Sequence, residues 1–410
     1  MAKAPWLTIL GVGDDGLASL NASAKLLFDQ AETVIAPARV LEVIDTGDKN
    51  TIPWTFGVSE TIAFIKERRG EATTILATGD PMHFGIGATL RRFFDEDEML
   101  VIPTPSGFSL AAAKLGWRLQ ETAMISLHGR SVAGLVPHIQ PGRQIISLTS
   151  NAKTIYAAAQ SLAERKFAKS KLTILEHIGG ASEKISTFLA DELLNEDKDF
   201  ADFNMLAIEC VAEDGAGFFS CAPGLDDDAF LHDGQLTKRE VRALTLSLLA
   251  PYPHATLWDI GAGCGSIGIE WMRASQGAKA FAIEQDASRC ELIAKNANVL
   301  GTPTLKIHHG SALDQLSELP APDAIFIGGG LTSNGLFDAC WDALPVGKKL
   351  VANAVTVQSE AYLTKLFETH GGELTRLQVS RAIPVGKFHG WKSNMPVTLW
   401  SVTKQNMKGA

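Results

Sequence analysis

Two glycine-rich loops, one near the start of the chain and one in its second half, limit the possible folds more than any other feature. The stretches "ILGVGDDGLASL" (9–20) and "LWDIGAGCGSIGIE" (257–270) each contain the spacing Gly-x-Gly-x-x-Gly after an apolar run. This order predicts a buried strand followed by a tight turn, because glycine lets the backbone turn sharply and approach a ligand at the carboxyl end of a strand. We therefore expect α/β domains with two separate ligand sites.

The boundary between the two domains is predicted from a change in composition. The stretch "CVAEDGAGFFSCAPGLDDDAF" (210–230) is rich in small residues and ends in an acidic run. Such a stretch is typical of a linker. We place one domain at 1–212, the linker at 213–225 and the second domain at 226–410. The sequences around the two glycine loops differ, so the domains are not a detectable repeat.

Composition excludes several classes of protein. A chain of 410 residues predicts two or three domains, and its net charge of −9 argues against nonspecific nucleic-acid binding. The longest apolar runs fall well short of the roughly 18 residues that a membrane span needs, so no membrane partner is expected. The five cysteines show no Cys-x-x-Cys spacing. We therefore expect no metal site, no disulfide framework and a cytoplasmic location.

Two acids favour a nucleoside ligand without a pyrophosphate at the second loop. The strand predicted at 279–284 ends in Glu284, where a carboxylate suits the two hydroxyls of a ribose. Asp259 precedes the first glycine by two residues. It could face the positive amino group of a methionine moiety or orient the loop, and it would repel a pyrophosphate. Further along, "DAIFIGGG" (323–330) predicts a strand that opens onto a glycine turn, where a substrate could enter.

This ordered set, completed by the "GSALD" stretch (310–314), resembles the class I (Rossmann-like) S-adenosylmethionine-dependent methyltransferases. The resemblance implies S-adenosylmethionine as the cofactor, with Ser311 and the backbone of Ala312 at the adenine. The alternative is a structural turn without a ligand. The cofactor-binding residues expected in this domain are Thr237, Gly261, Ala262, Gly263, Cys264, Gly265, Glu284, Ser311 and Ala312.

The first loop belongs to a different pattern. Asp14 and Asp15 follow Gly13 directly and would oppose a phosphate. Gly-Asp-Pro (79–81) and a Pro-Ser-Gly turn (105–107) follow later strands. Together they resemble the tetrapyrrole (class III) methyltransferases over most of 5–210, although the family usually has proline at position 14 and Pro-Gly-x-Ser near position 106. The resemblance implies cofactor contacts by Gly11, Gly13, Gly79, Asp80, His83, Gly85 and Ser106.

Two later stretches extend this resemblance. "ILEHIGGASEKI" (174–185) is similar to the family's Glu-x-x-Gly stretch before a helix, and "NMLAIEC" (204–210) is similar to its closing strand. The resemblance implies a helix after the stretch 174–185.

Both halves in one chain, with the run "LTKREVR" (236–242) before a helix, resemble the precorrin-6Y (precorrin-6B) C5,15-methyltransferases (decarboxylating) of cobalamin biosynthesis. The resemblance implies that the first domain methylates carbon 5 of precorrin-6B. The second would methylate carbon 15 and remove carbon dioxide from the ring C acetate, giving precorrin-8. Alternatives are another tetrapyrrole substrate, or one domain that only binds substrate. The acids near both loops disfavour a dehydrogenase.

The anionic tetrapyrrole implied as substrate would need cationic contacts. The residues that we assign to the reaction are Arg381, Lys387 and Lys238, although each could instead be a solvated surface charge. Further candidates are Arg239, Arg39, His128 and Arg130. For His308 and His309 we expect a satisfied or exposed side chain. We also expect a homo-oligomer.

Overall fold

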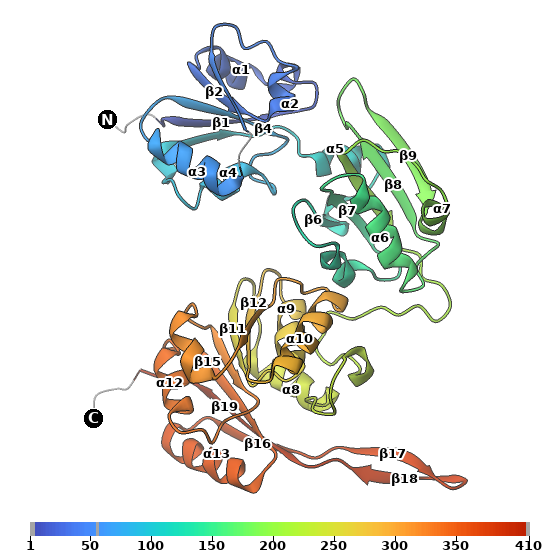
Figure 1. Cartoon of the computed structure of the whole chain (residues 1–410), viewed down its shortest axis with the longest axis vertical. Coiled ribbons are helices and arrows are strands. Elements are labelled where there is room, and N and C mark those ends of the chain that lie inside the picture. Colours follow the sequence, from blue (N-terminus) through green and yellow to red (C-terminus); the bar gives the residue numbers. More distant parts are fainter. Residues whose placement is uncertain (1–4, 55–56, 407–410) are drawn as a thin grey trace. The chain divides into compact units, whose positions relative to one another are not determined.

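The computed structural model describes residues 5–54 and 57–406 (Figure 1). The chain forms two compact units. The first comprises Met1–Val132 and His138–Gly217, and the second comprises Ala133–Pro137 and Phe218–Ala410. Both units contain sheets flanked by helices, which confirms the predicted α/β class.

The first sheet of the first unit is entirely parallel, with the strand order β3-β2-β4-β1-β5. Its strands are β1 (Leu7–Val12), β2 (Thr33–Ala36), β3 (Asn50–Pro53), β4 (Thr73–Thr78) and β5 (Met99–Ile102). Its helices are α1 (Ala22–Asp29), α2 (Ala38–Leu41), α3 (Val58–Glu67) and α4 (Ile86–Leu90). The first glycine loop follows β1, and the Gly-Asp-Pro stretch follows β4, as the apolar runs predict. Because β1 and β4 are neighbours, both loops lie at the same edge of the sheet.

The second sheet of the first unit is mostly antiparallel, with the order β6-β7-β10-β8-β9. Its strands are β6 (Ala123–Ser126), β7 (Gln144–Leu148), β8 (Lys171–Glu176), β9 (Lys184–Leu189) and β10 (Asn204–Glu209). Its helices are α5 (Gly107–Leu115), α6 (Lys153–Ala163) and α7 (Ala190–Asn195).

The helix implied after the stretch 174–185 does not follow that stretch directly. Strand β9 occupies that place and pairs antiparallel with β8, from Glu176 opposite Lys184 to Lys171 opposite Leu189. The segment between them turns through Gly179, whose φ of +81° suits a tight connection between two strands. A strand that pairs with β8 therefore comes before the helix, and α7 begins at Ala190.

The second unit has a seven-stranded sheet with the order β13-β12-β11-β14-β15-β19-β16, in which only β19 runs antiparallel to its neighbours. Its strands are β11 (Thr256–Ile260), β12 (Lys279–Glu284), β13 (Lys306–His309), β14 (Ala324–Ile327), β15 (Lys349–Ala354), β16 (Glu373–Leu377) and β19 (Val397–Thr403). Its helices are α8 (Arg239–Leu249), α9 (Ser266–Ala274), α10 (Ala287–Val299), α11 (Ala312–Gln315), α12 (Leu336–Ala343) and α13 (Val357–His370). The chain reverses its direction of winding between β11 and β14, which creates a crevice at their carboxyl ends.

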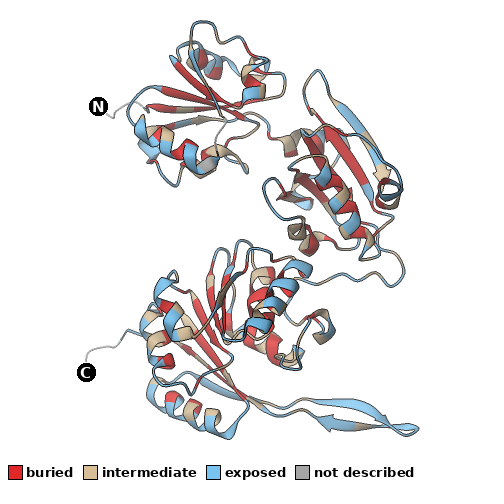
Figure 2. Ribbon diagram, in the orientation of Figure 1, coloured by how far each residue is buried: buried red, intermediate tan, exposed pale blue. Residues whose placement is uncertain are grey.

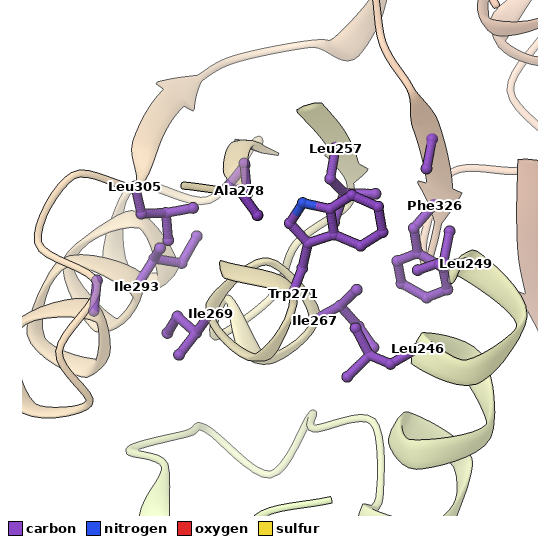
Figure 3. Close-up of a cluster of buried hydrophobic side chains, with 14 of the residues drawn as sticks. Leu246, Leu249, Leu257, Ile267, Ile269, Trp271, Ala278, Ile293, Leu305 and Phe326 are labelled. Carbon is purple, nitrogen blue, oxygen red and sulfur yellow. The ribbon is translucent and has the colours of Figure 1, made fainter. Parts of the chain in front are cut away.

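Burial explains why these segments form a sheet covered by helices. The strands are largely buried, while the outer faces of the helices are exposed (Figure 2). On α9, Ile267 and Trp271 lie one turn apart and pack with Leu246, Leu257 and Phe326 (Figure 3). Full burial of each large apolar side chain contributes roughly 1.5–3 kcal/mol. This core holds α9, and with it the glycine loop, against the sheet.

A two-stranded hairpin, β17 (Ser380–Val385) and β18 (Phe388–Ser393), extends from the second unit as a separate ribbon (Figure 1). Its side chains are almost all exposed, including Phe388 at 79% and Trp391 at 78%.

In the part of the chain that the structure describes, no helix combines the length and the apolar character needed to cross a bilayer.

Candidate active site

A cavity of about 850 Å³ lies in the crevice of the second unit. Its walls come from the loop after β11, the end of β12, the start of α11, the glycines after β14 and the segment 234–238. Among the residues predicted for this site, those that line the cavity are Thr237, Lys238, Gly261, Ala262, Gly263, Cys264, Glu284, Ser311 and Ala312. The volume lies in the range of about 300–1,000 Å³ that is usual for small-molecule sites.

The three glycines of the loop after β11 have different tasks, although Gly261, Gly263 and Gly265 all have positive φ. A Cβ atom on Gly261 would lie 2.8 Å from the Cα atom of Gly329, so this glycine allows two loops to pack closely. A Cβ atom on Gly263 would meet nothing nearer than the carbonyl oxygen of Gln235, at 3.9 Å. Gly263 therefore leaves space for a ligand. Gly265 is not part of the cavity lining and makes the turn into α9.

Glu284 is held at the cavity by its own surroundings. Its carboxylate accepts hydrogen bonds from the backbone amides of Gly263 at 2.8 Å, Gln285 at 2.9 Å and Asp286 at 3.1 Å. A carboxylate has about four acceptor positions, so one remains for a donor in the cavity. The fixed acid next to an open glycine backbone suits the hydroxyl groups of a nucleoside.

Asp259 was expected either to face the amino group of a methionine moiety or to orient the glycine loop. In the structure it orients the loop. It is fully buried and lies outside the cavity lining, and its Oδ2 atom accepts a hydrogen bond from the amide of Gly268 at 2.9 Å. Burial raises the pKa of this carboxyl group to about 7, although the Gly268 hydrogen bond lowers it in part. Among the described residues, its Oδ1 atom has no hydrogen-bond partner.

A buried ion pair holds the segment that brings Thr237 and Lys238 to the cavity, here named the cap segment (residues 224–238). Arg242 Nε lies 2.6 Å from Glu270 Oε1, and both side chains are at most 1% exposed. Arg242 also donates to the carbonyl oxygen of Thr237 at 2.5 Å. Glu270 accepts from the amide of Leu225 at 3.1 Å. The sequence analysis noted Arg242 only within the "LTKREVR" run and did not assign this role.

One part of the cavity lining, here named the far wall, was not predicted from the sequence. Its residues are Asn353, Val355, Leu377, Val379, Asn394, Met395 and Val397. Asn353 lies near the carboxyl end of β15, where the rule for ligand sites in open α/β sheets could have pointed to it. The positions from Leu377 onward flank β16 and β19, whose placement depends on tertiary pairing.

Cationic side chains are few at the cavity. Among the described residues, its lining includes only Lys238 and Arg289. Arg289 is 2.8 Å from Asp233, whereas Lys238 lies 3.8 Å from its nearest carboxylate partner, Asp227. The other predicted cations are elsewhere.

The predicted contacts Arg381 and Lys387 belong to the hairpin and do not line the cavity. Arg381 forms an ion pair with Glu240 at 2.9 Å, and Lys387 lies in the turn between β17 and β18. Arg239 forms an ion pair with Asp226 at 2.5 Å. Their contact with substrate stays a prediction.

The predicted N-terminal cofactor residues form three adjoining loops. Gly11 packs against Gly79 so closely that a Cβ atom would clash with the carbonyl oxygen of Gly79. Asp80 accepts a hydrogen bond from the amide of Met82 at 2.8 Å, which closes a local turn. Ser106 caps α5 by accepting from the amide of Ser109 at 3.2 Å.

His83 and Gly85, which were also predicted to contact the cofactor, lie in the loop between β4 and α4. The ring of His83 lies 4.6 Å from that of Phe108, so His83 packs against α5. Gly85 precedes α4, and a Cβ atom there would lie 2.5 Å from the carbonyl oxygen of Pro81. Gly13 donates its amide to Ser19 Oγ at 2.7 Å, which closes the first loop. Gly11 thus lies near the end of β1, and the other six predicted residues lie in loops or at helix starts.

The acid after Gly13 is paired within the first unit. Asp14 Oδ1 accepts from Arg39 at 3.1 Å, and Asp14 Oδ2 lies 3.1 Å from Nδ1 of His177. Arg39 also donates to Thr78 Oγ1 at 2.6 Å, next to the Gly-Asp-Pro stretch. His177 was not singled out in the sequence, because the spacing of the motifs gives no sign that it reaches the first loop.

The remaining basic candidates have varied surroundings. His128 shares a hydrogen bond with the carbonyl oxygen of Thr149 at 3.0 Å, and the guanidinium of Arg130 lies 6.0 Å from the ring centre of Phe84. His309 shares a hydrogen bond with the carbonyl oxygen of Gln285 at 3.0 Å.

Over residues 5–54 and 57–406, no group of three or more His, Cys, Asp or Glu side chains is arranged for a metal ion.

Each unit matches a known family of methyltransferases. Residues 7–194 match the family "Tetrapyrrole (Corrin/Porphyrin) Methylases", and residues 228–404 match "Precorrin methyltransferase domain". A Pyrobaculum aerophilum protein named probable cobalt-precorrin-6B C(15)-methyltransferase (decarboxylating) is 32% identical over 40% of this chain and 88% of its own.

Full-length similarity extends to two proteins that are each named precorrin-6Y C(5,15)-methyltransferase [decarboxylating]. The protein from Mycobacterium tuberculosis is 36% identical over 97% of this chain and all of its own length. The protein from Sinorhizobium sp is 44% identical over 98% of this chain and 97% of its own. Together with the two matched domains, this similarity shows that the chain belongs to the family of decarboxylating precorrin-6Y C(5,15)-methyltransferases.

Proposed function

We propose that this chain methylates precorrin-6B (precorrin-6Y) at carbons 5 and 15, with S-adenosylmethionine as methyl donor, and removes carbon dioxide from the ring C acetate. The observation that carries the proposal is the cavity in the second unit, where an anchored Glu284 faces an open glycine backbone. This cavity lies in a chain that aligns with decarboxylating C(5,15)-methyltransferases over nearly its whole length.

The residues around this cavity suit S-adenosylmethionine, which would supply an electrophilic methyl group. Glu284 would accept a hydrogen bond from the ribose, and Gly263 would leave room for the nucleoside next to it. Ser311 and the amide of Ala312 are at the cavity wall, where an adenine edge could be read. Methyl transfer from a sulfonium requires alignment of the two carbons and the sulfur, so the main task of these residues is positioning.

The uncharged far wall suits the decarboxylation. Val355, Leu377 and Val379 contribute apolar surface to the cavity, and the described lining has no cation on that side. A carboxylate placed there would lose hydration, which favours movement of its charge into the electron-accepting ring system as carbon dioxide leaves. Lys238, elsewhere in the cavity lining, would meet other carboxylates of the macrocycle.

We assign the carbon 15 methylation and the decarboxylation to the second unit and the carbon 5 methylation to the first. Two comparisons support this division. The precorrin methyltransferase model covers only 228–404 of this chain. The Pyrobaculum aerophilum relative covers 40% of this chain, and its name combines decarboxylation with carbon 15 alone.

Mass spectrometry of the tetrapyrrole product tests the proposal directly. Full-length protein incubated with precorrin-6B and S-adenosylmethionine should add two methyl groups and remove one carbon dioxide. A reaction without S-adenosylmethionine is the control and should leave the mass of the substrate unchanged. A product with methyl groups at other positions by NMR, or without loss of carbon dioxide, would overturn it.

A further inference from the structure

An aspartate–histidine pair joins the first glycine loop to the segment after β8, within the first unit, and none of the roles assigned so far uses it. Asp14 follows Gly13 directly, and its Oδ2 atom lies 3.1 Å from Nδ1 of His177 at the end of β8. Gly180 makes this approach possible, because a Cβ atom there would lie 2.5 Å from Asp14 Oδ2. The pair therefore connects the predicted cofactor loop after β1 with the segment after β8, which is far away in the sequence.

Both oxygen atoms of the Asp14 carboxylate have a partner. Its Oδ1 atom accepts from Arg39, and the guanidinium of Arg39 lies 3.7 Å from the ring centre of Phe203 and also donates to Thr78. Because a carboxylate oxygen only accepts hydrogen bonds, Nδ1 of His177 must carry the hydrogen of the 3.1 Å contact. In the neutral form of the imidazole, Nε2 then holds the lone pair.

The imidazole is held in place while Nε2 stays available. The edge of the His177 ring contacts Phe203, with ring centres 5.5 Å apart. The side chain is 35% exposed, and among the described residues no hydrogen bond to Nε2 is present. His177 also has a φ of +47°, which is uncommon for a residue other than glycine and is found more often at functional sites. An acid that orients one nitrogen and leaves the other free is the usual arrangement of a general base.

We propose that His177 is the general base of the carbon 5 methylation and that Asp14 orients it; this inference rests on the proposed function. As the new carbon–carbon bond forms from the π electrons of carbon 5, the carbon–sulfur bond of the methyl donor breaks and its electron pair stays on sulfur. Carbon 5 then carries both a hydrogen and the new methyl group. Nε2 of His177 takes that hydrogen as a proton, and the electrons of the carbon–hydrogen bond restore the double bond. The exposed imidazole then passes the proton to water.

Two substitutions at position 177 separate a base from a structural contact. Glycine tolerates the positive φ and leaves space for an added imidazole, whereas asparagine tolerates it and can still donate to Asp14. Both His177→Gly and His177→Asn should lower the rate of carbon 5 methylation on the order of 10²-fold. Added imidazole, mostly neutral at the assay pH, should restore His177→Gly but not His177→Asn.

A matched control comes from the second unit. His254 also has positive φ, at +65°, and its side chain is exposed. His254→Gly should leave carbon 5 methylation unchanged with or without imidazole. Calorimetry should find S-adenosylmethionine binding by both position 177 variants within a few-fold of that of the unsubstituted protein.

A readout independent of turnover is ¹⁵N NMR of the histidine-labelled full chain, with His177→Asn used to assign the His177 signals. The hydrogen should be on Nδ1, and Asp14→Asn should weaken this preference. Full activity of either His177 variant, lack of rescue by imidazole, or a hydrogen on Nε2 would each overturn the inference. If the unsubstituted protein fails to add two methyl groups, the proposed function itself is wrong.

Discussion

At the scale of single residues, Glu284 combines two tasks that a sequence pattern cannot separate. Its three bonds from backbone amides shape the loop, and its remaining acceptor position faces the cavity. Removal of the carboxylate should therefore affect both the loop and the ligand.

We expect Glu284→Ala to weaken S-adenosylmethionine binding in the second unit roughly 10- to 150-fold, because charge-assisted hydrogen bonds contribute about 1.5–3 kcal/mol. Isothermal titration calorimetry measures the change. Glu291→Ala removes an exposed carboxylate from α10 and should have no effect. Equal affinities for Glu284→Ala and the unsubstituted protein would exclude Glu284 from the site.

The raised pKa of the buried Asp259 carboxyl group leads us to expect that the stability of the second unit depends on pH in an unusual way. Its pKa lies at about 7 in the folded protein, against an ordinary value of 3.8, so the folded state keeps a proton that the unfolded state releases. The contribution of Asp259 to the free energy of unfolding should fall as pH rises from 3.8 to about 7 and stay constant above that.

Asp259→Asn should remove this pH dependence and raise the stability of the second unit above pH 7 by a few kcal/mol, since one pKa unit corresponds to about 1.4 kcal/mol. Urea unfolding between pH 5 and pH 8 tests the expectation. Parallel stability curves for the two proteins over that range would show that the buried carboxyl group is not protonated in the folded state.

At the scale of elements, the cap segment depends on the Arg242–Glu270 pair for its position. Glu270 accepts from the amides of Gly224 and Leu225 at one end, and Arg242 donates to Thr237 at the other. The pair therefore links the start of the segment to the part that lines the cavity.

Arg242→Met alone should destabilise the second unit by about 3–5 kcal/mol, because it leaves the Glu270 carboxylate buried without its partner. The double variant Arg242→Met/Glu270→Leu should recover most of that stability. It should still exchange the amide hydrogens of Gly224 and Leu225 faster and bind S-adenosylmethionine more weakly. Hydrogen-exchange mass spectrometry and calorimetry measure both effects; unchanged binding by the double variant would mean that the cap segment does not need the pair.

At the scale of the whole molecule, the assignment of one methylation to each unit predicts partial reactions. Gly263→Arg places a large side chain in the open part of the cavity and should give a product with one new methyl group that keeps its carboxylate. Asp80→Ala should impair only the carbon 5 methylation, because it opens the turn closed by the Met82 amide.

Gly347→Arg is the matched control for Gly263→Arg, since Gly347 also has positive φ and open space around it but lies outside the cavity. Product mass distinguishes the variants. Normal release of carbon dioxide by Gly263→Arg would mean that decarboxylation belongs elsewhere in the chain.

The chain should also be separable. Fragments 1–217 and 218–410 follow the division into two compact units except at Ala133–Pro137, which belong to the second unit but stay in the first fragment. Each fragment contains its own sheets and buried core. Each fragment, expressed alone, should be soluble and unfold cooperatively by calorimetry. Insoluble or non-cooperative fragments would show that the predicted linker at 213–225 is wrongly placed. The expected homo-oligomer stays a prediction and can be measured on the same samples by light scattering.

The sequence by itself was sufficient for features that depend on neighbouring residues. Apolar runs followed by glycine turns predicted β1, β4, β11 and β14 with the loops after them, because strand formation and turn geometry depend mainly on local side chains. Glu284 could be predicted as a cavity residue for the same reason, since it ends the strand next to β11.

Only the tertiary structure decided which distant residues meet. Asp14 and His177 are 163 positions apart, and their contact requires the packing of two sheets within the first unit. Likewise β9, which was not predicted, is a strand because β8 offers it backbone partners. The far wall of the cavity depends on β19, which pairs antiparallel between β15 and β16. Such contacts depend on long-range burial and pairing free energies, which local sequence patterns do not contain.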